Sequence, residues 1–124
     1  MAAIEAEDTA IRFKSPWGSI IGIWDWDVIH DRNHVDPDCA ALFGIDPSKA
    51  SGALTLGAYL NAVHPDDVAG LSDKIDATLK GGGVLEAEYR IVTGNRTRRV
   101  FARGYCTLDQ SKRPSRLPGA IIEL

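Results

Sequence analysis

The residues of this chain that could carry out chemistry are its histidines, its cysteines and the carboxylates next to them. His64 is followed by Pro65, Asp66 and Asp67, so His64 could act with Asp66 or Asp67 as a general acid–base pair, and Asp67 is the partner we carry forward. Such a pair would suit a small cone-fold isomerase or dehydratase. A structural explanation is stronger, because carboxylates at a predicted helix start oppose the positive end of the helix dipole. We therefore assign no catalytic residue and keep the cone-fold enzyme as the alternative function.

The three histidines and two cysteines do not show the spacing of a metal site. His64 is the best haem-ligand candidate among the histidines, but its place at a helix start is enough to explain it. His30 and His34 lie in a predicted polar turn. No motif supports haem or flavin, so the cofactor is unknown at this stage. Cys39 and Cys106 are isolated, and they are expected to be reduced, buried thiols.

Length and composition predict one globular domain. The chain has 124 residues, of which 44% are hydrophobic and 25% are charged, enough to build a single core. No apolar run approaches the ~20 residues that cross a bilayer, so no membrane span is expected. Residues 1–8 carry acids rather than the basic and apolar regions of a signal peptide, which predicts a cytoplasmic location.

The net charge of −3 is made of two unequal parts. Residues 1–89 contain 15 acids and 6 bases, whereas residues 90–116 contain 8 bases and one acid. In the basic part, arginines alternate with aromatic residues, as in a stacking platform for nucleic acid on a sheet. These residues are Arg96, Arg98, Arg99, Phe101, Arg103 and Tyr105. The isoelectric point near 5.5 favours an acidic protein surface as the partner instead, so no nucleic acid is expected.

The N-terminal residues predict a short helix. Residues 1–14 lack internal Gly and Pro, and Ile4 and Ile11 lie two turns apart on one helical face. Ser15-Pro16 ends this helix, because a residue before proline is disfavoured in the α region. A helix of this length is unstable alone in water and must pack on another surface.

Three repeated residue pairs predict helix starts. Asp36-Pro37, Asp46-Pro47 and His64-Pro65 each place a polar residue at the N-cap and proline at the first helical position. We expect short helices from the first two prolines and a long helix from Pro65 to about Lys80. Thr55 is placed to cap another short helix.

Alternation of apolar and polar residues predicts the strands. Residues 20–29 form the first strand, with Trp24 and Trp26 on one face, and a turn at 30–33 leads to a short returning strand. After the glycines at 81–83, strands are expected at 84–92, 98–108 and 117–124. A Gly94-Asn95 turn joins the first two of these. This order of elements indicates an α+β fold with an antiparallel sheet.

Six motifs in this order resemble those of a PAS domain. They are Gly22-Ile23-Trp24-Asp25-Trp26-Asp27, Leu42-Phe43-Gly44, His64-Pro65-Asp66-Asp67, Glu88-Tyr89-Arg90-Ile91, Arg103-Gly104 and Gly119. The nearest resemblance is to the bacterial sensory subclass with a W-x-W-D first strand and an H-P-D-D helix start. It covers residues 18–124 and leaves residues 1–17 as an N-terminal helix and dimerisation extension.

The resemblance implies a five-stranded antiparallel sheet with short helices on one face, an N-terminal helix and a small cavity. Such a domain senses a signal by binding a small ligand or by dimerising, without catalysis of its own. It regulates an output domain such as a histidine kinase or a cyclic-dinucleotide enzyme. The pocket candidates are Trp24, Trp26, Leu42, Tyr59, Leu60, His64, Tyr89, Val100 and Cys106. Alternatively, these bulky residues fill the core and leave no room for a ligand.

The resemblance also implies a homodimer in which the N-terminal helix packs on the outer sheet face. The interface candidates are Ile4, Ile11, Ile21, Ile23, Phe101 and Tyr105. The light-sensing branch of this family needs a reactive cysteine in an Asn-Cys-Arg-Phe type of run, whereas Cys39 is followed by Ala40-Ala41-Leu42. The chain ends where a linker to an output domain would start, which fits one domain of a longer protein or a stand-alone sensor.

Overall fold

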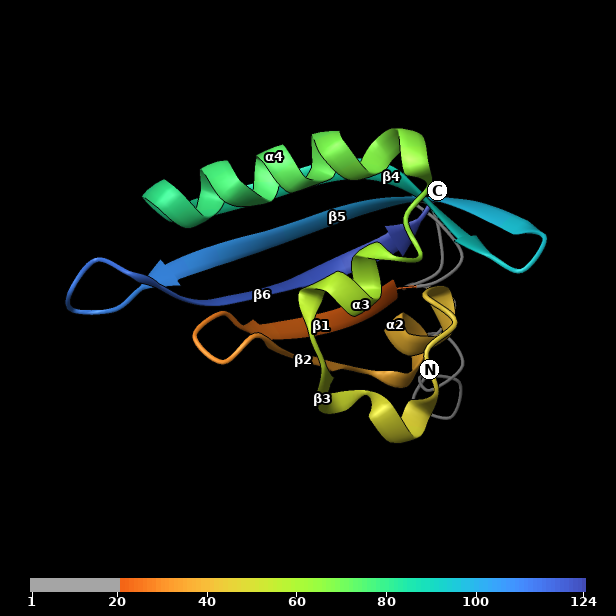
Figure 1. Cartoon of the computed structure of the whole chain (residues 1–124), viewed down its shortest axis with the longest axis horizontal. Coiled ribbons are helices and arrows are strands. Elements are labelled where there is room, and N and C mark those ends of the chain that lie inside the picture. The colour runs from red at the N-terminus through yellow and green to blue at the C-terminus, as the bar shows by residue number, and fades with distance from the viewer. Residues whose placement is uncertain (1–20) are drawn as a thin grey trace, which may run out of the picture.

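Six strands form one antiparallel sheet in the computed structural model, which describes residues 21–124 (Figure 1). The strands are β1 (Ile21–Asp27), β2 (Arg32–Val35), β3 (Ser51–Leu54), β4 (Gly83–Thr93), β5 (Arg96–Leu108) and β6 (Pro114–Glu123). Their order in the sheet is β3-β2-β1-β6-β5-β4, and each neighbouring pair is antiparallel. The first and last strands of the described chain therefore pair at the centre of the sheet.

Short helices cover one face of this sheet. They are α2 (Pro37–Leu42), the 3₁₀ helix η2 (Pro47–Lys49), α3 (Leu56–Leu60) and α4 (Pro65–Gly81). Figure 1 shows α4 running along the β4 edge, with α2 and α3 nearer to β1 and β2. The predicted starts at Pro37, Pro47 and Pro65 are confirmed, although the second begins a single 3₁₀ turn. None of the described helices has the length and apolar character needed to cross a membrane.

The sheet has one strand more than the five expected from the sequence. The additional strand is β3, a four-residue edge strand that pairs only with β2. Its sequence, Ser-Gly-Ala-Leu, is too short and too small to give an alternation signal. The other expected strands are present, and their ends differ from the expected ones by at most three residues. The helix predicted over residues 1–14, with Ile4 and Ile11, lies outside the described residues.

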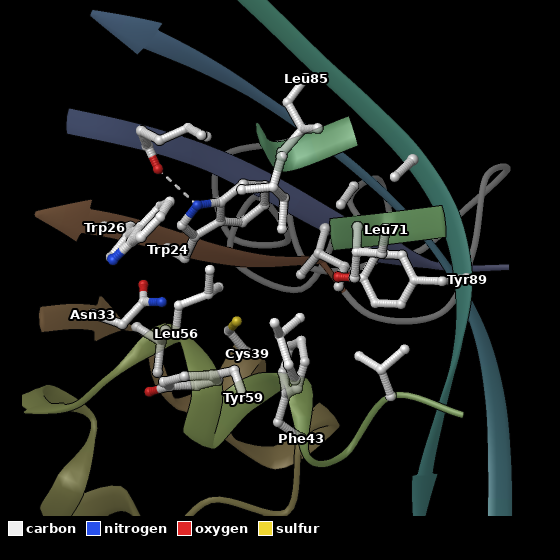
Figure 2. Close-up of a pocket in the computed structure, with 18 residues that line it drawn as sticks. Trp24, Trp26, Asn33, Cys39, Phe43, Leu56, Tyr59, Leu71, Leu85 and Tyr89 are labelled. Atoms are coloured by element: carbon white, nitrogen blue, oxygen red, sulfur yellow. Dashed lines mark hydrogen bonds between the residues drawn. The ribbon is translucent and has the colours of Figure 1, made fainter. Parts of the chain in front are cut away.

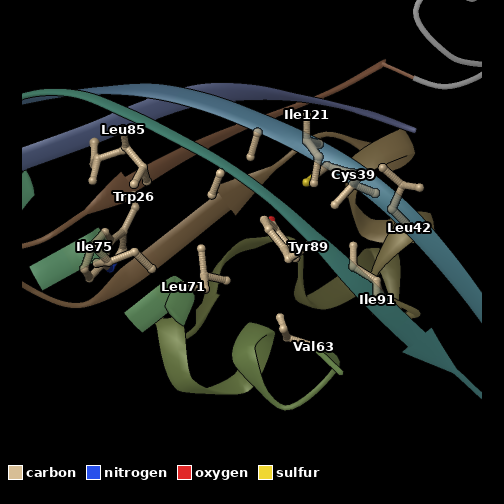
Figure 3. Packing of buried hydrophobic residues seen from close by; sticks show 14 of the residues in the cluster. Trp26, Cys39, Leu42, Val63, Leu71, Ile75, Leu85, Tyr89, Ile91 and Ile121 are labelled. Atoms are coloured by element: carbon tan, nitrogen blue, oxygen red, sulfur yellow. The ribbon is translucent and has the colours of Figure 1, made fainter. Parts of the chain in front are cut away.

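The alternation pattern correctly predicts which side of β4 and β5 faces the helices. The inward residues of these two strands that are buried are Leu85, Ala87, Tyr89, Ile91, Val100, Ala102 and Cys106. From the opposite side, α4 adds Leu71 and Ile75, one helical turn apart (Figure 3). Cys39 and Cys106 are free, buried thiols, as expected.

One side chain at the β1–β2 hairpin joins three parts of the fold. Asp31 Oδ1 accepts a hydrogen bond from the Trp26 indole N–H at 2.9 Å. The same oxygen accepts from the backbone N–H of Leu56, the first residue of α3, at 2.9 Å. Asp31 has a φ of 49°, in the left-handed region that Asp tolerates better than most residues. Asp31 therefore anchors the short helix α3 to the sheet.

Replacement of Asp31 tests this anchor. Asp31→Ala should lower the free energy of unfolding by about 1–3 kcal/mol, because two partly buried donors lose their acceptor. Asp31→Asn keeps an acceptor oxygen and tolerates the backbone angle, so its loss should be clearly smaller. Asp31→Gly relieves the backbone but supplies no acceptor, and should remain destabilised. Urea unfolding followed by tryptophan fluorescence measures all three, and full stability of the glycine variant would contradict the anchor.

Candidate functional site

A cavity of about 70 Å³ lies between the inner face of the sheet and the helices (Figure 2). Among residues 21–124, its lining is mostly apolar and comes from five of the six strands and from α2, α3 and α4 or their ends. Five of the lining residues are aromatic: Trp24, Trp26, Phe43, Tyr59 and Tyr89. A molecule in this cavity would therefore touch the sheet and its helical cover at the same time.

Two glycines on neighbouring strands make room for the Trp24 ring. Gly119 is the cross-strand partner of Trp24 on one side and of Gly104 on the other. A Cβ atom at Gly119 would lie 2.3 Å from the Trp24 ring, and one at Gly104 would lie 2.9 Å from it. The Trp24 indole N–H also donates to the Leu117 carbonyl at 2.7 Å. This close approach and this hydrogen bond fix the ring as one wall of the cavity.

Two buried polar atoms of the lining have no hydrogen-bond partner among the residues that the structure describes. They are Asn33 Oδ1 and the Tyr59 hydroxyl, and each residue is only 4% exposed. Such a group without a partner costs about 1–3 kcal/mol. Burial raises the pKa of Tyr59, so its hydroxyl keeps the proton and can donate. In contrast, the Trp24 and Trp26 indole N–H groups are both bonded.

The Cys39 thiol in the lining is unreactive. Burial raises the pKa of Cys39 to about 12, and the nearby Asp36 carboxylate adds to this shift. Cys39 is therefore a neutral, apolar side chain at neutral pH rather than a nucleophile. Burial also raises the pKa of Tyr89. No charged side chain of the described part of the chain lines the cavity.

The structure places five of the nine pocket candidates along the cavity. These are Trp24, Trp26, Tyr59, Leu60 and Tyr89. Leu42, Val100 and Cys106 lie in the fully buried core instead of in the lining. His64 is not in the lining either, because its Nδ1 accepts from the backbone N–H of Asp66 at 3.1 Å and caps α4.

Thirteen of the lining residues are not among the sequence candidates, and Asn33 is the one of them with a polar amide side chain. The pattern predicts a polar surface turn at 30–33, and for Asn33 this is wrong. β2 begins at Arg32 and lies between β1 and β3, which turns Asn33 towards the core. Asn33 lies two positions before the apolar Val35, and residues two apart in a strand share a face. This spacing is the only local signal that could have indicated an inward Asn33 side chain.

The carboxylate of the suggested acid–base pair is used elsewhere. Asp67 Oδ1 accepts from Arg90 Nη2 at 2.9 Å, and Oδ2 accepts from Nε at 2.9 Å and from the backbone N–H of Arg90 at 2.8 Å. The Arg90 side chain is the main cause that lowers the pKa of Asp67 to about 2. The Asp67 carboxylate therefore ties the start of α4 to β4 and is not free to act as a base with His64.

The residues present do not fit a haem or a flavin. His64, the best haem-ligand candidate of the sequence, lies outside the lining. A volume of about 70 Å³ is also far below the roughly 300–1,000 Å³ of pockets for drug-sized ligands. Within residues 21–124, His, Cys, Asp and Glu side chains do not gather in groups of three or more that could hold a metal ion.

The outer face of the sheet carries exposed apolar side chains. Ile23 on β1 is 57% exposed and Tyr105 on β5 is 55% exposed, while Phe101 is half-buried. Ile21 and Phe101 both pair with Ile122 of β6, which lies between their strands. These positions bring the described interface candidates together on one surface. Ile4 and Ile11 lie outside the described residues.

The arginines of the basic part are largely neutralised within the fold. Four of them pair with acids of the N-terminal part: Arg90 with Asp67, Arg99 with Glu88, Arg103 with Glu86, and Arg116 with Asp25. Two further pairs join Arg98 to Glu123 and Arg113 to Asp109. These ion pairs partly compensate the unequal charge of the two parts, which reduces the positive potential that a nucleic acid would need.

Comparison with known proteins places these features in a family. Residues 32–121 match the family described as PAS fold. The chain is similar to a sensory box histidine kinase/response regulator from Burkholderia thailandensis, with 22% identity, a TM-score of 0.72, and coverage of 97% of this chain and 85% of that one. Among curated proteins, no sequence matches significantly.

Two other solved structures have the same fold. The N-terminal domain of a diguanylate cyclase with a PAS/PAC sensor from Marinobacter aquaeolei has 16% identity, a TM-score of 0.72, and coverage of 83% of this chain and 94% of that one. A LOV protein from Rhodobacter sphaeroides has 17% identity, a TM-score of 0.63, and coverage of 100% and 69%. At these identities, the similarity shows a shared architecture.

The Asp67–Arg90 contact predicts a pH-dependent stability. The ordinary pKa of an aspartate is 3.8 and that of Asp67 is about 2, so its contribution is complete above pH ~4 and is lost as the pH falls through about 2. Asp67→Asn lacks this charge. The difference in unfolding free energy between wild type and variant should therefore shrink as the pH falls below about 4.

Urea unfolding at a series of pH values measures this difference. Asp66→Asn is the matched control, because Asp66 is the next residue and its side chain is 78% exposed. A difference for Asp67→Asn that stays constant from about pH 6 down to pH 3 would contradict the role given to this contact.

The unpartnered Tyr59 hydroxyl predicts an unusual mutational result. Tyr59→Phe should leave the free energy of unfolding unchanged or raise it, because the variant removes a buried polar group that has no partner. Tyr59→Leu should lower it, because it also removes the edge-to-face contact with Phe43, whose ring centroid lies 5.4 Å away. Thermal and urea unfolding compare the two variants. A loss of about 1 kcal/mol or more in Tyr59→Phe would mean that the hydroxyl has a partner in solution.

Proposed function

The chain belongs to the PAS-fold family, and from this we propose that it is a sensory module of a signalling protein. The cavity on the inner face of the sheet receives the signal. The outer face of the same sheet passes it to a second copy of the chain or to an output domain. In this function His64 and Asp67 position α4, and the domain is a sensor rather than a catalyst.

The observation that carries the proposal is that alternate residues of the same strands build the cavity and the outer face. On β1, Trp24 lines the cavity and the preceding Ile23 is exposed on the outside. On β5, Ala102 lines the cavity and Phe101 lies on the outside. Neighbouring side chains of a strand point to opposite faces. A ligand that shifts these strands from inside therefore alters the outer surface directly.

The outer face is the proposed homodimer interface. Exposed apolar side chains gathered on one face are typical of an interaction surface. The residues proposed for it are Ile21, Ile23, Phe101 and Tyr105 of the sheet, together with Ile4 and Ile11 of the 1–17 extension. The cross-strand ion pairs on this face leave few unpaired charges among the apolar residues, so burial against a second copy costs less.

The partners of the domain are proposed from the same family. Two similar structures are named as a sensory box histidine kinase/response regulator and as a diguanylate cyclase with a PAS/PAC sensor. An output domain of one of these kinds is the natural proposal for this chain. The two free, buried thiols favour a reducing compartment such as the cytoplasm, and the paired arginines argue against nucleic acid as the partner.

Charge substitutions on the outer face test the proposed dimer. Ile23→Glu and Tyr105→Glu should each reduce the mass in light scattering from that of two copies to that of one, because the carboxylate would be buried without a partner. Ile29→Glu is the matched control, since Ile29 is 59% exposed but lies in the β1–β2 turn, beyond the end of the strand. A wild-type protein that is already monomeric, or a dimer that survives both substitutions, would contradict this interface.

A further inference from the structure

We infer that the cavity binds a small, uncharged molecule that carries both a hydrogen-bond donor and an acceptor. The Asn33 amide oxygen and the Tyr59 hydroxyl are its polar contacts. This inference rests on the proposed sensory function and specifies the class of ligand that its cavity takes. It is carried by the two unpartnered atoms, by the lack of charge in the lining and by the volume.

The two unpartnered atoms define the polar groups of the ligand. Asn33 Oδ1 can only accept, so the ligand must offer an N–H or O–H group there. The Tyr59 hydroxyl can donate, so the ligand can place a carbonyl or hydroxyl oxygen against it. Figure 2 shows both side chains on the side of the cavity where Trp26 lies. The indole N–H groups of the two lining tryptophans already have acceptors and do not compete for the ligand.

The lining selects against ionised ligands. Its described side chains are apolar or neutral, and the Cys39 thiol remains protonated. Among the described residues, two carboxylates contact lining residues, and both already have donors. Asp31 accepts from the Trp26 indole and from the backbone of Leu56, and Asp36 accepts from the backbone N–H of Cys39. A carboxylate, phosphate or ammonium group in the cavity would lose its hydration without gaining a counter-ion. The ligand is therefore neutral.

The volume limits the ligand to very few atoms. The cavity measures about 70 Å³, about half of the roughly 150 Å³ of an apolar protein cavity that accepts benzene. By this proportion, a ligand of about three to five non-hydrogen atoms fits without rearrangement. Nucleotides, flavins and porphyrins are excluded by size as well as by charge.

Water alone satisfies this site poorly. A buried water makes two to four hydrogen bonds and typically about three, so the two unpartnered atoms of this cavity, on otherwise apolar walls, offer it only the minimum. A molecule with a polar group on an apolar body uses both atoms and also contacts the walls. Trp24, Leu60 and Leu71 supply such apolar contacts from the sheet, α3 and α4.

Three molecules of equal size separate these requirements in the 124-residue chain. Acetamide is neutral with a donor and an acceptor, acetone has an acceptor only, and acetate is ionised. Each is titrated into the protein while the indole N–H signals of Trp24 and Trp26, which line the cavity, are followed by NMR. Acetamide should give saturable shifts at both signals and bind about three- to tenfold more tightly than acetone, which lacks one hydrogen bond. Acetate should give no saturable shift.

Two variants assign the contacts. Asn33→Leu removes the acceptor, so it should weaken acetamide about three- to tenfold and leave acetone unchanged. Tyr59→Phe removes the donor, so it should weaken both molecules. Asn95→Leu makes the same change as Asn33→Leu at an exposed position, and it should bind like wild type.

The inference is overturned if acetate matches acetamide, if no ligand saturates the indole signals, or if neither inner variant weakens the binding of acetamide. The wild-type series alone decides the first two outcomes, so the result does not depend on the folding of a variant. Failure of the dimer prediction leaves these titrations unaffected. If the titrations fail in a protein that still dimerises through its outer face, the proposed ligand class is refuted and the proposed signalling role is not.

Discussion

The fit of the Trp24 indole against Gly104 and Gly119 is the constraint on which the inner face of the sheet depends. Any side chain at Gly119 would collide with the ring, because even a Cβ atom would lie 2.3 Å from it. The ring can therefore lie close to β5 and β6, and its N–H bonds to the Leu117 carbonyl. This contact fixes one wall of the cavity. The indole N–H, the polar group of that wall, already has its acceptor. The remaining space is small and is shaped before a ligand arrives.

The opposite wall is held by side chains that bond to helix backbones. α3 has five residues and α2 has six, and helices of this length are not stable alone. Asp31 bonds the first residue of α3, and Asp36 caps α2 through the backbone N–H of Cys39. Because α3 carries Tyr59, the position of its unpartnered hydroxyl follows from the Asp31 anchor. A ligand that bonds this hydroxyl therefore acts on the shortest of the described α-helices, opposite the sheet that forms the outer face.

How much the sequence predicts depends on how local each signal is. Proline after an N-cap residue marks the helix starts at Pro37 and Pro65, because capping involves adjacent residues only. The inward side of β5 follows from simple alternation. The burial of Asn33 is not readable in this way, since it arises from the pairing of β2 between β1 and the unpredicted β3. Whether a core residue lines the cavity, as Tyr89 does, or packs beside it, as Val100 does, depends on shifts of a few ångströms that no sequence pattern records.

If Asn33 and Tyr59 together hold a small neutral molecule in the PAS cavity, a crystal structure of the 124-residue chain grown with acetamide will show it. We expect density for one acetamide within hydrogen-bond distance of Asn33 Oδ1 and of the Tyr59 hydroxyl, with the Trp24 ring still against Gly104 and Gly119. Density for water alone at these two atoms, or a cavity without density, would refute this assignment.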